Sequence, residues 1–154
     1  MGEYRILEDD LSGEDVAELL RFHVAEATAN SPPGKVHALP IDKLREPGVA
    51  FFAARDGERL AAIGALKRID ERRAEIKSMR AAPEYRGKGA GEAILEHLIA
   101  EARRQGYSWL GLETGRTPPF QPAVALYRKH GFVPCEKFGD YLPDDFSQCM
   151  ARDL

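Results

Sequence analysis

The chain has few cysteines and no long apolar run. Its only two cysteines, Cys135 and Cys149, are too few for a disulfide framework and lie in no CxxC or zinc-binding spacing. No stretch approaches the roughly 20 apolar residues that span a membrane, and the first residues lack a signal-peptide pattern. We therefore expect a reduced, cytoplasmic protein with no membrane partner.

An excess of positive charge is also missing. The net charge of −3 argues against a general nucleic-acid binder, although Arg and Lys cluster between residues 67 and 88. The four histidines, His23, His37, His97 and His130, show no metal-ligand spacing, so no metal is predicted. The hydrophobic fraction of 44% is typical of a soluble globular protein. A chain of 154 residues is long enough for one domain, residues 1–154, and too short for two.

Hydrophobic patterns and turn residues predict a mixed α/β chain. The N-terminal half should hold a helix that begins near Ser12, with Asp15 as a capping-box partner, and a short helix at 41–45. Strands are expected at 4–7, 49–55, 60–69 and 74–81. Tight turns join the last three of these strands, so they should form an antiparallel meander.

The sequence pattern of the C-terminal half predicts one parallel pair of strands. A helical pattern over 92–105 leads into a strand at 109–113, which should return parallel to the strand that ends at Ala81. A helix near Pro122 to His130 and closing strands at 132–135 and 147–151 follow. We expect about six or seven strands in one mixed, mostly antiparallel sheet, with helices on both faces.

The segment Arg86-Gly87-Lys88-Gly89-Ala90-Gly91 lies between the strand ending at Ala81 and the helix at 92–105. Glycines at alternate positions allow backbone conformations that a Cβ forbids and a close approach to a ligand. Amide N–H groups at the start of a helix attract anions, and Arg86 and Lys88 add positive charge. The segment therefore predicts a site for a phosphate or pyrophosphate.

Two other interpretations of this glycine run stay open at this point. It can be a tight strand-to-helix connection with no ligand. A dinucleotide site needs Gly-x-Gly-x-x-Gly, whereas the spacing here is Gly-x-Gly-x-Gly, but Glu113 has roughly the position of the acidic ribose ligand. A P-loop is excluded, because no Gly-x-x-x-x-Gly-Lys followed by Ser or Thr occurs.

Two motifs resemble the GNAT superfamily of N-acetyltransferases. Arg86 to Gly91 is similar to the family's Arg/Gln-x-x-Gly-x-Gly/Ala motif, and Ala125 to Phe132 resembles its Leu-Tyr-x-x-x-Gly-Phe block. The element order is similar from Tyr4 to Met150. The chain looks most like a bacterial subset with Glu-Ile-Lys-Ser-Met-Arg before the glycine turn and Leu-Glu-Thr-Gly on the next strand.

The resemblance implies acetyl-CoA as the cofactor. It implies a central parallel strand pair that splays, so that the pantetheine arm lies in a slot along the main chain of Met79, Arg80 and Ala81. The pyrophosphate would lie on the turn and the helix start, formed by Arg86, Gly87, Lys88, Gly89, Ala90, Gly91 and Glu92. A backbone N–H near Arg80 or Ala81 would then polarise the thioester carbonyl.

The implied reaction is direct attack on the thioester by a primary amine of a small-molecule or amino-acid-like acceptor. The resemblance implies that Tyr127 supplies a proton or a strong hydrogen bond to the departing thiolate. A different interpretation of Tyr127 is a buried ring that only fills the core beside Phe132. A non-catalytic acyl-CoA-sensing module on the same fold is the alternative function, and it would not need Tyr127.

The general base and the acceptor contacts are less defined. Many family members have Glu where this chain has Lys77, which leaves Glu75 and Glu113 as candidate bases acting through water, and Lys77 as a cation for a substrate carboxylate. Alternation places Glu75, Lys77 and Met79 on one strand face unless a bulge intervenes.

Other positions suggest where the acceptor pocket lies. His37 is a candidate substrate contact in the loop 31–48, and Tyr141, Asp144 and Asp145 are a candidate second pocket wall. Phe120 departs from an Asn that is common in related sequences and that bonds the pantetheine. Cys135 and Cys149 should be neighbours on the last hairpin, and a homodimer is an open alternative to a monomer, as for many similar proteins.

Overall fold

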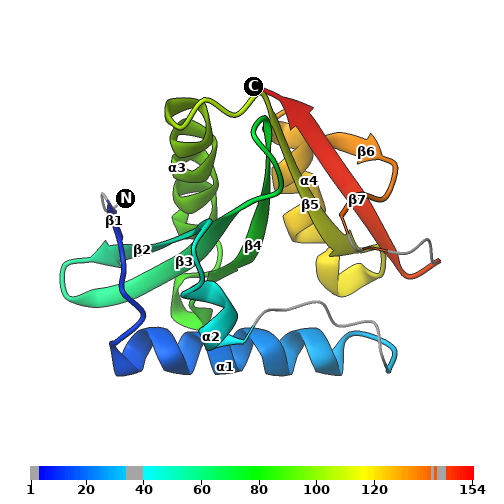
Figure 1. The fold of residues 1–154 in the computed structure, drawn as a ribbon. Helices are drawn as coiled ribbons and strands as arrows, with labels where there is room; N and C mark the ends of the chain where they lie inside the picture. Colours follow the sequence, from blue (N-terminus) through cyan, green and yellow to red (C-terminus); the bar gives the residue numbers. More distant parts are fainter. Residues whose placement is uncertain (1–3, 34–39, 140, 142–144) are drawn as a thin grey trace.

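The computed structural model describes residues 4–33, 40–139, 141 and 145–154 (Figure 1). Over these residues the strands form one seven-stranded sheet in the order β1-β2-β3-β4-β5-β7-β6. The strands are β1 Arg5–Glu8, β2 Val49–Asp56, β3 Arg59–Arg68, β4 Arg73–Ala81, β5 Trp109–Gly115, β6 Val133–Cys135 and β7 Ser147–Asp153. The helices are α1 Glu14–Ala29, α2 Ile41–Leu44, α3 Ala90–Arg104 and α4 Gln121–Lys129, with short 3-10 turns at Pro83–Tyr85 and Pro118–Phe120.

The predicted antiparallel meander is confirmed. β1 to β4 pair antiparallel in chain order, and the β2–β3 hairpin closes with Asp56 opposite Arg59. Gly57 takes a φ of +60° in this turn, a conformation that favours glycine. The predicted strand and helix boundaries are close to the observed ones, because buried faces repeat with the strand or helix period.

The parallel pair β4–β5 is short and then splays, as the family resemblance implied. The paired residues are Arg73 with Trp109, Ala74 with Leu110 and Glu75 with Gly111, while β5 continues antiparallel to β7 up to Gly115. Figure 1 shows β4 and β5 starting side by side near the C-terminus and then diverging. We call the diverging parts, Ile76–Ala81 of β4 and Leu112–Gly115 of β5, the splayed region.

A bulge in β4 changes which side chains share a face. Ile63 is opposite Arg80 but Ala65 is opposite Lys77, so β4 holds an extra residue there, and Ser78 has a φ of +54°. An extra residue reverses the alternation of side chains beyond it. Lys77 and Arg80 therefore share one face of the sheet, while Met79 turns to the other.

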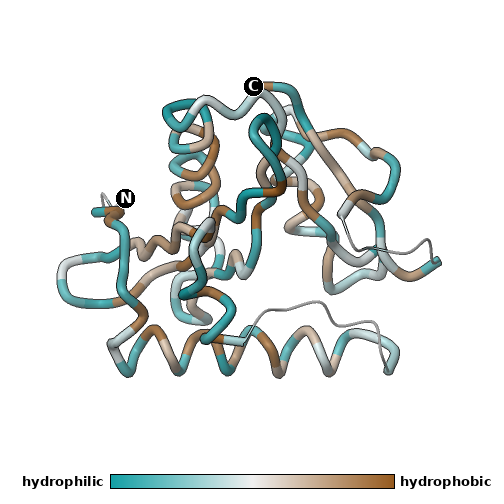
Figure 2. Tube along the Cα trace, viewed as in Figure 1, coloured by the Kyte–Doolittle hydropathy of each residue, from teal (hydrophilic) through white to brown (hydrophobic). Residues whose placement is uncertain are grey.

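Helices cover both faces of the sheet. α3 buries Ile94, Leu98 and neighbouring apolar residues close against β3, where a Cβ on Gly64 would lie 2.9 Å from Leu98 Cδ1. Met79 lies on this same face, with its Cγ 3.6 Å from that Cβ position. α1 contacts the opposite face, where its His23 bonds to Arg80. Figure 2 shows apolar and polar segments alternating along α1 and α3, as expected for helices with one buried side.

The predicted cap of the first helix is wrong. α1 begins at Glu14 after Gly13, and no side-chain hydrogen bond caps it. The Ser12 hydroxyl instead donates to Asp10 at 2.6 Å, and the Asp15 carboxylate forms an ion pair with Arg55 at 2.6 Å. A charged partner from β2 has taken the carboxylate that a capping box would use.

Candidate functional site

The glycine turn presents main-chain donors at the start of α3. Gly87 and Gly89 have φ values of +72° and +82°, where an L side chain would be strained. The first backbone bond of the helix runs from Ala93 N to Gly89 O at 2.9 Å. The amides from Ala90 to Glu92 therefore precede the helical ladder and are placed, together with the helix dipole, to bind an anion.

Two cations border this turn. Arg86, with 57% of its side chain exposed, lies 3.6 Å from the Glu26 carboxylate of α1. The Lys88 ammonium lies 5.7 Å from the centre of the Tyr85 ring, and the Lys88 carbonyl accepts a 2.7 Å bond from the Tyr4 hydroxyl. These contacts hold positive charge beside the main-chain donors of the turn.

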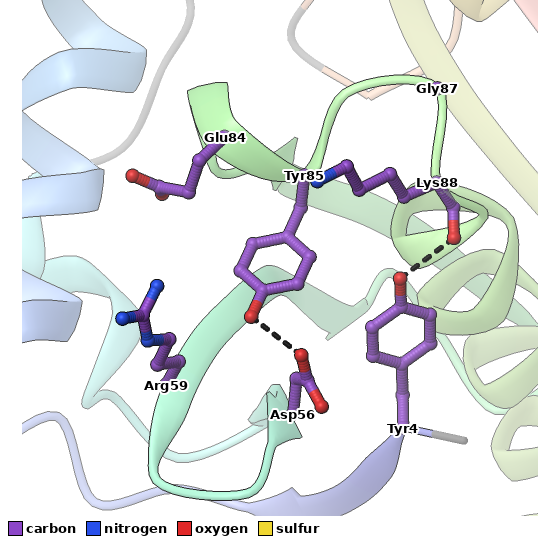
Figure 3. A pocket seen from close by; sticks show the side chains of 7 residues that line it. All are labelled: Tyr4, Asp56, Arg59, Glu84, Tyr85, Gly87 and Lys88. Carbon is purple, nitrogen blue, oxygen red and sulfur yellow. Dashed lines mark hydrogen bonds between the residues drawn. The ribbon is translucent and has the colours of Figure 1, made fainter. Parts of the chain in front are cut away.

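A cavity of about 560 Å³ lies beside the turn, on the side of the β2–β3 hairpin (Figure 3). Its lining residues are Tyr4, Asp56, Arg59, Glu84, Tyr85, Gly87 and Lys88. The Tyr85 hydroxyl donates to Asp56 at 2.7 Å, which fixes the ring in the wall of the cavity. No residue of the splayed region lines this cavity, so we do not assign the chemistry to it.

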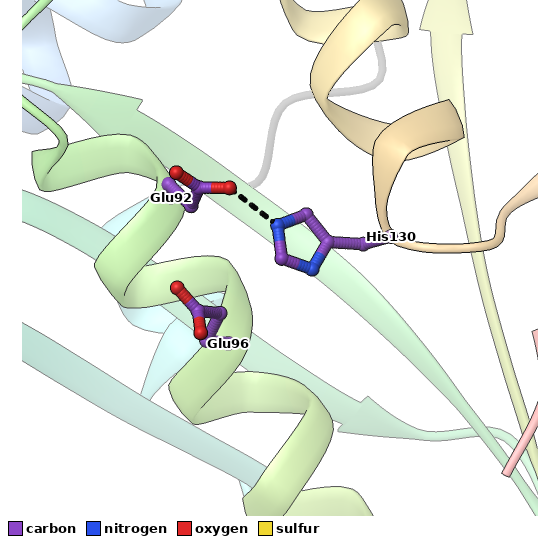
Figure 4. Close-up of side chains that lie close together, drawn as sticks. All are labelled: Glu92, Glu96 and His130. Atoms are coloured by element: carbon purple, nitrogen blue, oxygen red, sulfur yellow. Dashed lines mark hydrogen bonds and ion pairs between the residues drawn. The ribbon is translucent and has the colours of Figure 1, made fainter.

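An ion-pair network ties α4 to the first turn of α3. The Glu92 carboxylate lies 2.7 Å from both Lys129 Nζ and His130 Nε2, and the hydrogen bond from Lys129, followed by that from His130, lowers the pKa of Glu92. Glu96 is adjacent, and the ligand atoms of Glu92, Glu96 and His130 all lie within 4.8 Å of one another (Figure 4). Sequence spacing gave no sign of this grouping, because folding alone brings His130 to α3. Lys129 already matches the charge of Glu92 there.

The splayed region carries a second polar cluster on the face opposite α3. The Tyr141 hydroxyl, from the connection between β6 and β7, donates to the Glu75 carboxylate and accepts a hydrogen bond from Lys77 Nζ. Lys77 Nζ also lies 3.4 Å from Glu75, and the two side chains are only 11% and 6% exposed. The two β4 residues and the pocket-wall residue named from the sequence are thus in direct contact.

The charges of this cluster act on Tyr141. Burial, and then the carboxylate of Glu75, raise the pKa of Tyr141, and Glu113 on β5 raises it further. The phenol is therefore neutral and a donor at physiological pH. Both candidate bases, Glu75 and Glu113, lie within electrostatic range of this one hydroxyl. Asp145 is exposed, and His37 and Asp144 lie outside the described residues.

Tyr127 is buried in α4, with 7% of its surface exposed. Its ring meets Phe132 edge-on, with centroids 5.9 Å apart, which is the packing expected of a core residue. Burial raises the pKa of Tyr127 to about 12, and the positive charge of Arg80 opposes this rise. The phenol keeps its proton at neutral pH, so it can serve as a hydrogen-bond donor as well as a core ring.

Sequence reasoning missed the contact between His23 and the Arg80 side chain. Arg80 Nε donates to His23 Nδ1 at 3.0 Å, and the guanidinium lies 5.7 Å from the centre of the Phe22 ring. Burial and the nearby charge of Arg80 lower the pKa of His23 to about 4. Nothing local in the sequence indicates this pair, because α1 and β4 meet only in the folded chain.

The structure also shows the surroundings of Phe120 and of the two cysteines. The Phe120 ring covers Gly115 at the end of β5, where a Cβ would lie 2.4 Å from the ring, and Phe120 contacts Phe146 edge-on. An aromatic contact thus occupies the position where the family resemblance suggests an Asn. The prediction that Cys135 and Cys149 are neighbours is confirmed by their strand pairing, and burial raises the pKa of Cys149 to about 11.

Comparison with known proteins identifies sequences of similar length. The model of the acetyltransferase (GNAT) family matches residues 16–132. The chain is 44% identical over 146 residues to the uncharacterized N-acetyltransferase YsnE of Bacillus subtilis, covering 95% of this chain and 97% of that protein. It is 41% identical over 151 residues to YedL of Escherichia coli, another uncharacterized N-acetyltransferase, covering 98% and 95%.

Solved structures share the fold. A Klebsiella pneumoniae protein with a provisional assignment as an acyl-CoA N-acyltransferase aligns with a TM-score of 0.79. The alignment has 27% identity and covers 98% of this chain and 97% of that one. A Bacillus subtilis acetyltransferase in complex with CoA aligns with a TM-score of 0.73 over 99% of both chains, and at 19% identity it shows likeness of fold alone. Within the described residues, no helix is long and apolar enough to cross a membrane.

Proposed function

Because this chain belongs to the acetyltransferase (GNAT) family, we propose that it transfers an acetyl group from acetyl-CoA to a primary amine of a small-molecule or amino-acid-like acceptor. Membership of this family supports the general reaction, acyl transfer from an acyl-CoA, and the acetyl group and the amine acceptor are the proposed details. One observation supports the proposal most strongly: the open amides of the glycine turn come one short 3-10 turn after the strand that splays from its parallel neighbour.

The turn would hold the cofactor's pyrophosphate. The proposed contacts are the main chain of residues 87–92 and the charges of Arg86 and Lys88. Helix-start amides and adjacent cations together favour a doubly charged group. Two solved structures of this fold, from Bacillus subtilis and Elizabethkingia anophelis, contain CoA and acetyl-CoA respectively, which supports a CoA-type ligand here.

The pantetheine arm would lie along β4 in the splayed region. The pairing of β4 with β5 ends at Glu75 and Gly111, while β4 itself continues to Ala81. The main chain of Met79, Arg80 and Ala81 is therefore proposed to bond the arm as a strand partner would. An N–H of Arg80 or Ala81 would polarise the thioester carbonyl and stabilise the oxyanion.

The proton balance gives the remaining residues their proposed roles. An alkylammonium with a pKa near 10.4 must lose a proton before its nitrogen attacks. Glu75 or Glu113 would accept that proton through water. As the C–N bond forms and the C–S bond breaks, the phenol of Tyr127 would donate a hydrogen bond to the thiolate, and the proton released by the amine finally neutralises the sulfur.

The acceptor contacts remain proposals. Lys77 is proposed to border the acceptor because it lies in the splayed region beside Tyr141. His37 is kept as a proposed contact, although it lies outside the described residues. The cytoplasmic location expected from the sequence is likewise a proposal, and a homodimer stays an open alternative to a monomer.

A thiol-release assay tests the function. The full chain is given acetyl-CoA and a panel of alkyl amines, amino acids, aminoglycosides and peptides, and acetyl-CoA affinity is measured in parallel by calorimetry. We expect thiol release that depends on at least one amine. Tight acetyl-CoA binding without turnover on any amine would favour the non-catalytic sensing module, which the N-acetyltransferase relatives do not favour.

A further inference from the structure

The two cations of β4 that share the face opposite α3 differ in their partners. Lys77 has the Glu75 carboxylate 3.4 Å from its ammonium and also bonds the Tyr141 hydroxyl. Its charge is therefore already matched inside the protein. A substrate carboxylate that approached Lys77 would have to compete with Glu75 for the same ammonium.

Arg80 has no such partner among the residues that the structure describes. Its one hydrogen bond there runs from Nε to His23 Nδ1 at 3.0 Å, and no ion pair joins it to a carboxylate. Glu26 is the acidic residue whose charge affects the pKa of Arg80, but its carboxylate forms an ion pair with Arg86 instead. Burial lowers the pKa of Arg80, the charge of Glu26 opposes this change, and the charge of Arg86 adds to it.

No described residue forms a hydrogen bond or ion pair with the outer end of the guanidinium. Arg carries five N–H donors in a planar fork, and His23 takes only the one on Nε. The remaining donors on the two terminal nitrogens match a carboxylate in a bidentate arrangement. Phe22 lies near the guanidinium, 5.7 Å from ring centre to Cζ, and helps to hold its plane.

Arg80 is also close to the proposed chemistry. It lies beyond the last β4–β5 pair, in the splayed region, and its charge is felt by the buried Tyr127 phenol. An anion bound to its fork would therefore sit near both the proposed thioester position and the proposed proton donor.

We propose that the Arg80 guanidinium, held in place by His23, binds a carboxylate of the acceptor, so that the preferred acceptors are amines that carry a carboxylate, such as amino acids. This deepens the proposed function and rests on it. The acceptor supplies the negative charge that the protein does not, and the carboxylate orients the neighbouring amine toward the thioester.

His23 is a positioning residue in this proposal. Because its Nδ1 accepts from Arg80, the neutral ring carries its proton on Nε2. Imidazolium could not accept the bond and would repel the guanidinium. The ring thus fixes the fork without neutralising it, which a carboxylate in its place would do.

The test compares amines that differ only in the carboxylate. The full-length protein is assayed with acetyl-CoA and a panel of amino acids, each paired with its carboxamide. The amine of a carboxamide is less basic, so without a carboxylate subsite the amide would react faster at neutral pH. We expect kcat/KM to favour the acid by about 10- to 100-fold, the range of a charge-assisted hydrogen-bond pair.

Variants assign the preference to Arg80. Arg80→Gln should lower the acid-to-amide ratio to one or below, mainly through the KM of the acid, and Arg80→Lys should keep part of the preference for the acid. His23→Leu should lower the ratio, whereas His23→Asn, whose amide oxygen can accept from Arg80, should retain more. Arg103→Gln removes an exposed charge of α3 and should leave the ratio unchanged.

The outcomes separate this inference from the proposed function. If the unaltered protein uses the amides as fast as the acids, or faster, the subsite is overturned while acetyl transfer stands. A preference for aminophosphonates over the matching acids would overturn the carboxylate assignment. Equal losses for acid and amide in Arg80→Gln, matched by lost acetyl-CoA affinity, would assign the side chain to the cofactor and overturn the subsite. No turnover on any amine would overturn the proposed function, and the subsite with it.

Discussion

The glycine turn and the splayed region lie at the two ends of one strand-to-helix segment, yet they are built differently. The turn is made of main-chain amides from residues that are consecutive in the chain, and two of its glycines have positive φ. The splayed region is lined by side chains from α1, β4, β5, α4 and the β6–β7 connection. The proposed ligand of the turn, the cofactor's pyrophosphate, is the same for every acceptor, whereas the side chains of the splayed region are proposed to select the acceptor.

Tyr127→Phe gives the sharpest separation of the two regions. The substitution removes only the hydroxyl, so we expect kcat to fall about 100-fold, the lower range for loss of a proton-handling group. Acetyl-CoA affinity should stay within about twofold, because the turn is untouched. Steady-state kinetics and calorimetry measure both. Tyr107→Phe, which also alters a buried tyrosine, is the matched control. Near-normal kcat in Tyr127→Phe would restrict Tyr127 to core packing.

The pH dependence of stability, compared between the unaltered protein and His23→Gln, probes one residue that faces the splayed region. His23 has a folded-state pKa of about 4 against 6.5 for an unperturbed imidazole. The unfolded chain therefore binds the extra proton first, and stability that is fully present above pH 6.5 is lost as the pH falls toward 4. The loss amounts to at most about 3 kcal/mol. Urea unfolding between these pH values should show a shallower slope for His23→Gln. An identical slope would argue against a buried neutral His23.

Gly89→Val tests the turn without touching the acceptor side. Gly89 has a φ of +82° with open space around its Cβ position, so the cost is backbone strain of about 1–2 kcal/mol. A branched side chain among the anion-binding amides should also weaken acetyl-CoA binding about tenfold or more. Gly106→Val is the control, because Gly106 has a φ of +89°, equal space and a place at the far end of α3. Equal acetyl-CoA affinities in the two variants would contradict the pyrophosphate assignment.

Glu92→Gln should have the smallest effect. It weakens the contacts with Lys129 and His130 that tie α4 to α3, but these groups lie near the surface, where water and salt screen ion pairs. We expect a small drop in Tm that shrinks at high salt, and little change in the choice of acceptor. Thermal unfolding at two salt concentrations measures it. A large loss of kcat would mean that this network also holds Tyr127 in place.

Much of the fold could be predicted from the sequence. The β-meander, the parallel pair and the closing hairpin are confirmed, because each strand carries its own apolar pattern and turn residues. The helix cap at Ser12 was wrong, because Arg55 from a distant strand takes the Asp15 carboxylate. The bulge at Ser78 was foreseen only as an exception, since its positive φ depends on how β3 and β4 are paired.

The site divides in the same way. The turn from Arg86 to Gly91 could be found in the sequence because its geometry is local. The sequence named three candidates in one cluster, Glu75, Lys77 and Tyr141, but it did not predict the hydrogen bonds between them. These contacts show that the charge of Lys77 is already paired inside the protein. The link between His23 and Arg80 was not foreseen at all, and the roles of these residues in catalysis stay predictions.

The sequence by itself determined the family, the order of the strands and helices along the chain, and the position of the glycine turn, because these depend on local periodicity and on what glycine permits. Only the tertiary structure decided which cation of β4 is matched by an internal carboxylate and which is not. That difference arises because the bulge sets the face of each side chain, and because Tyr141 and His23 reach β4 from distant parts of the chain.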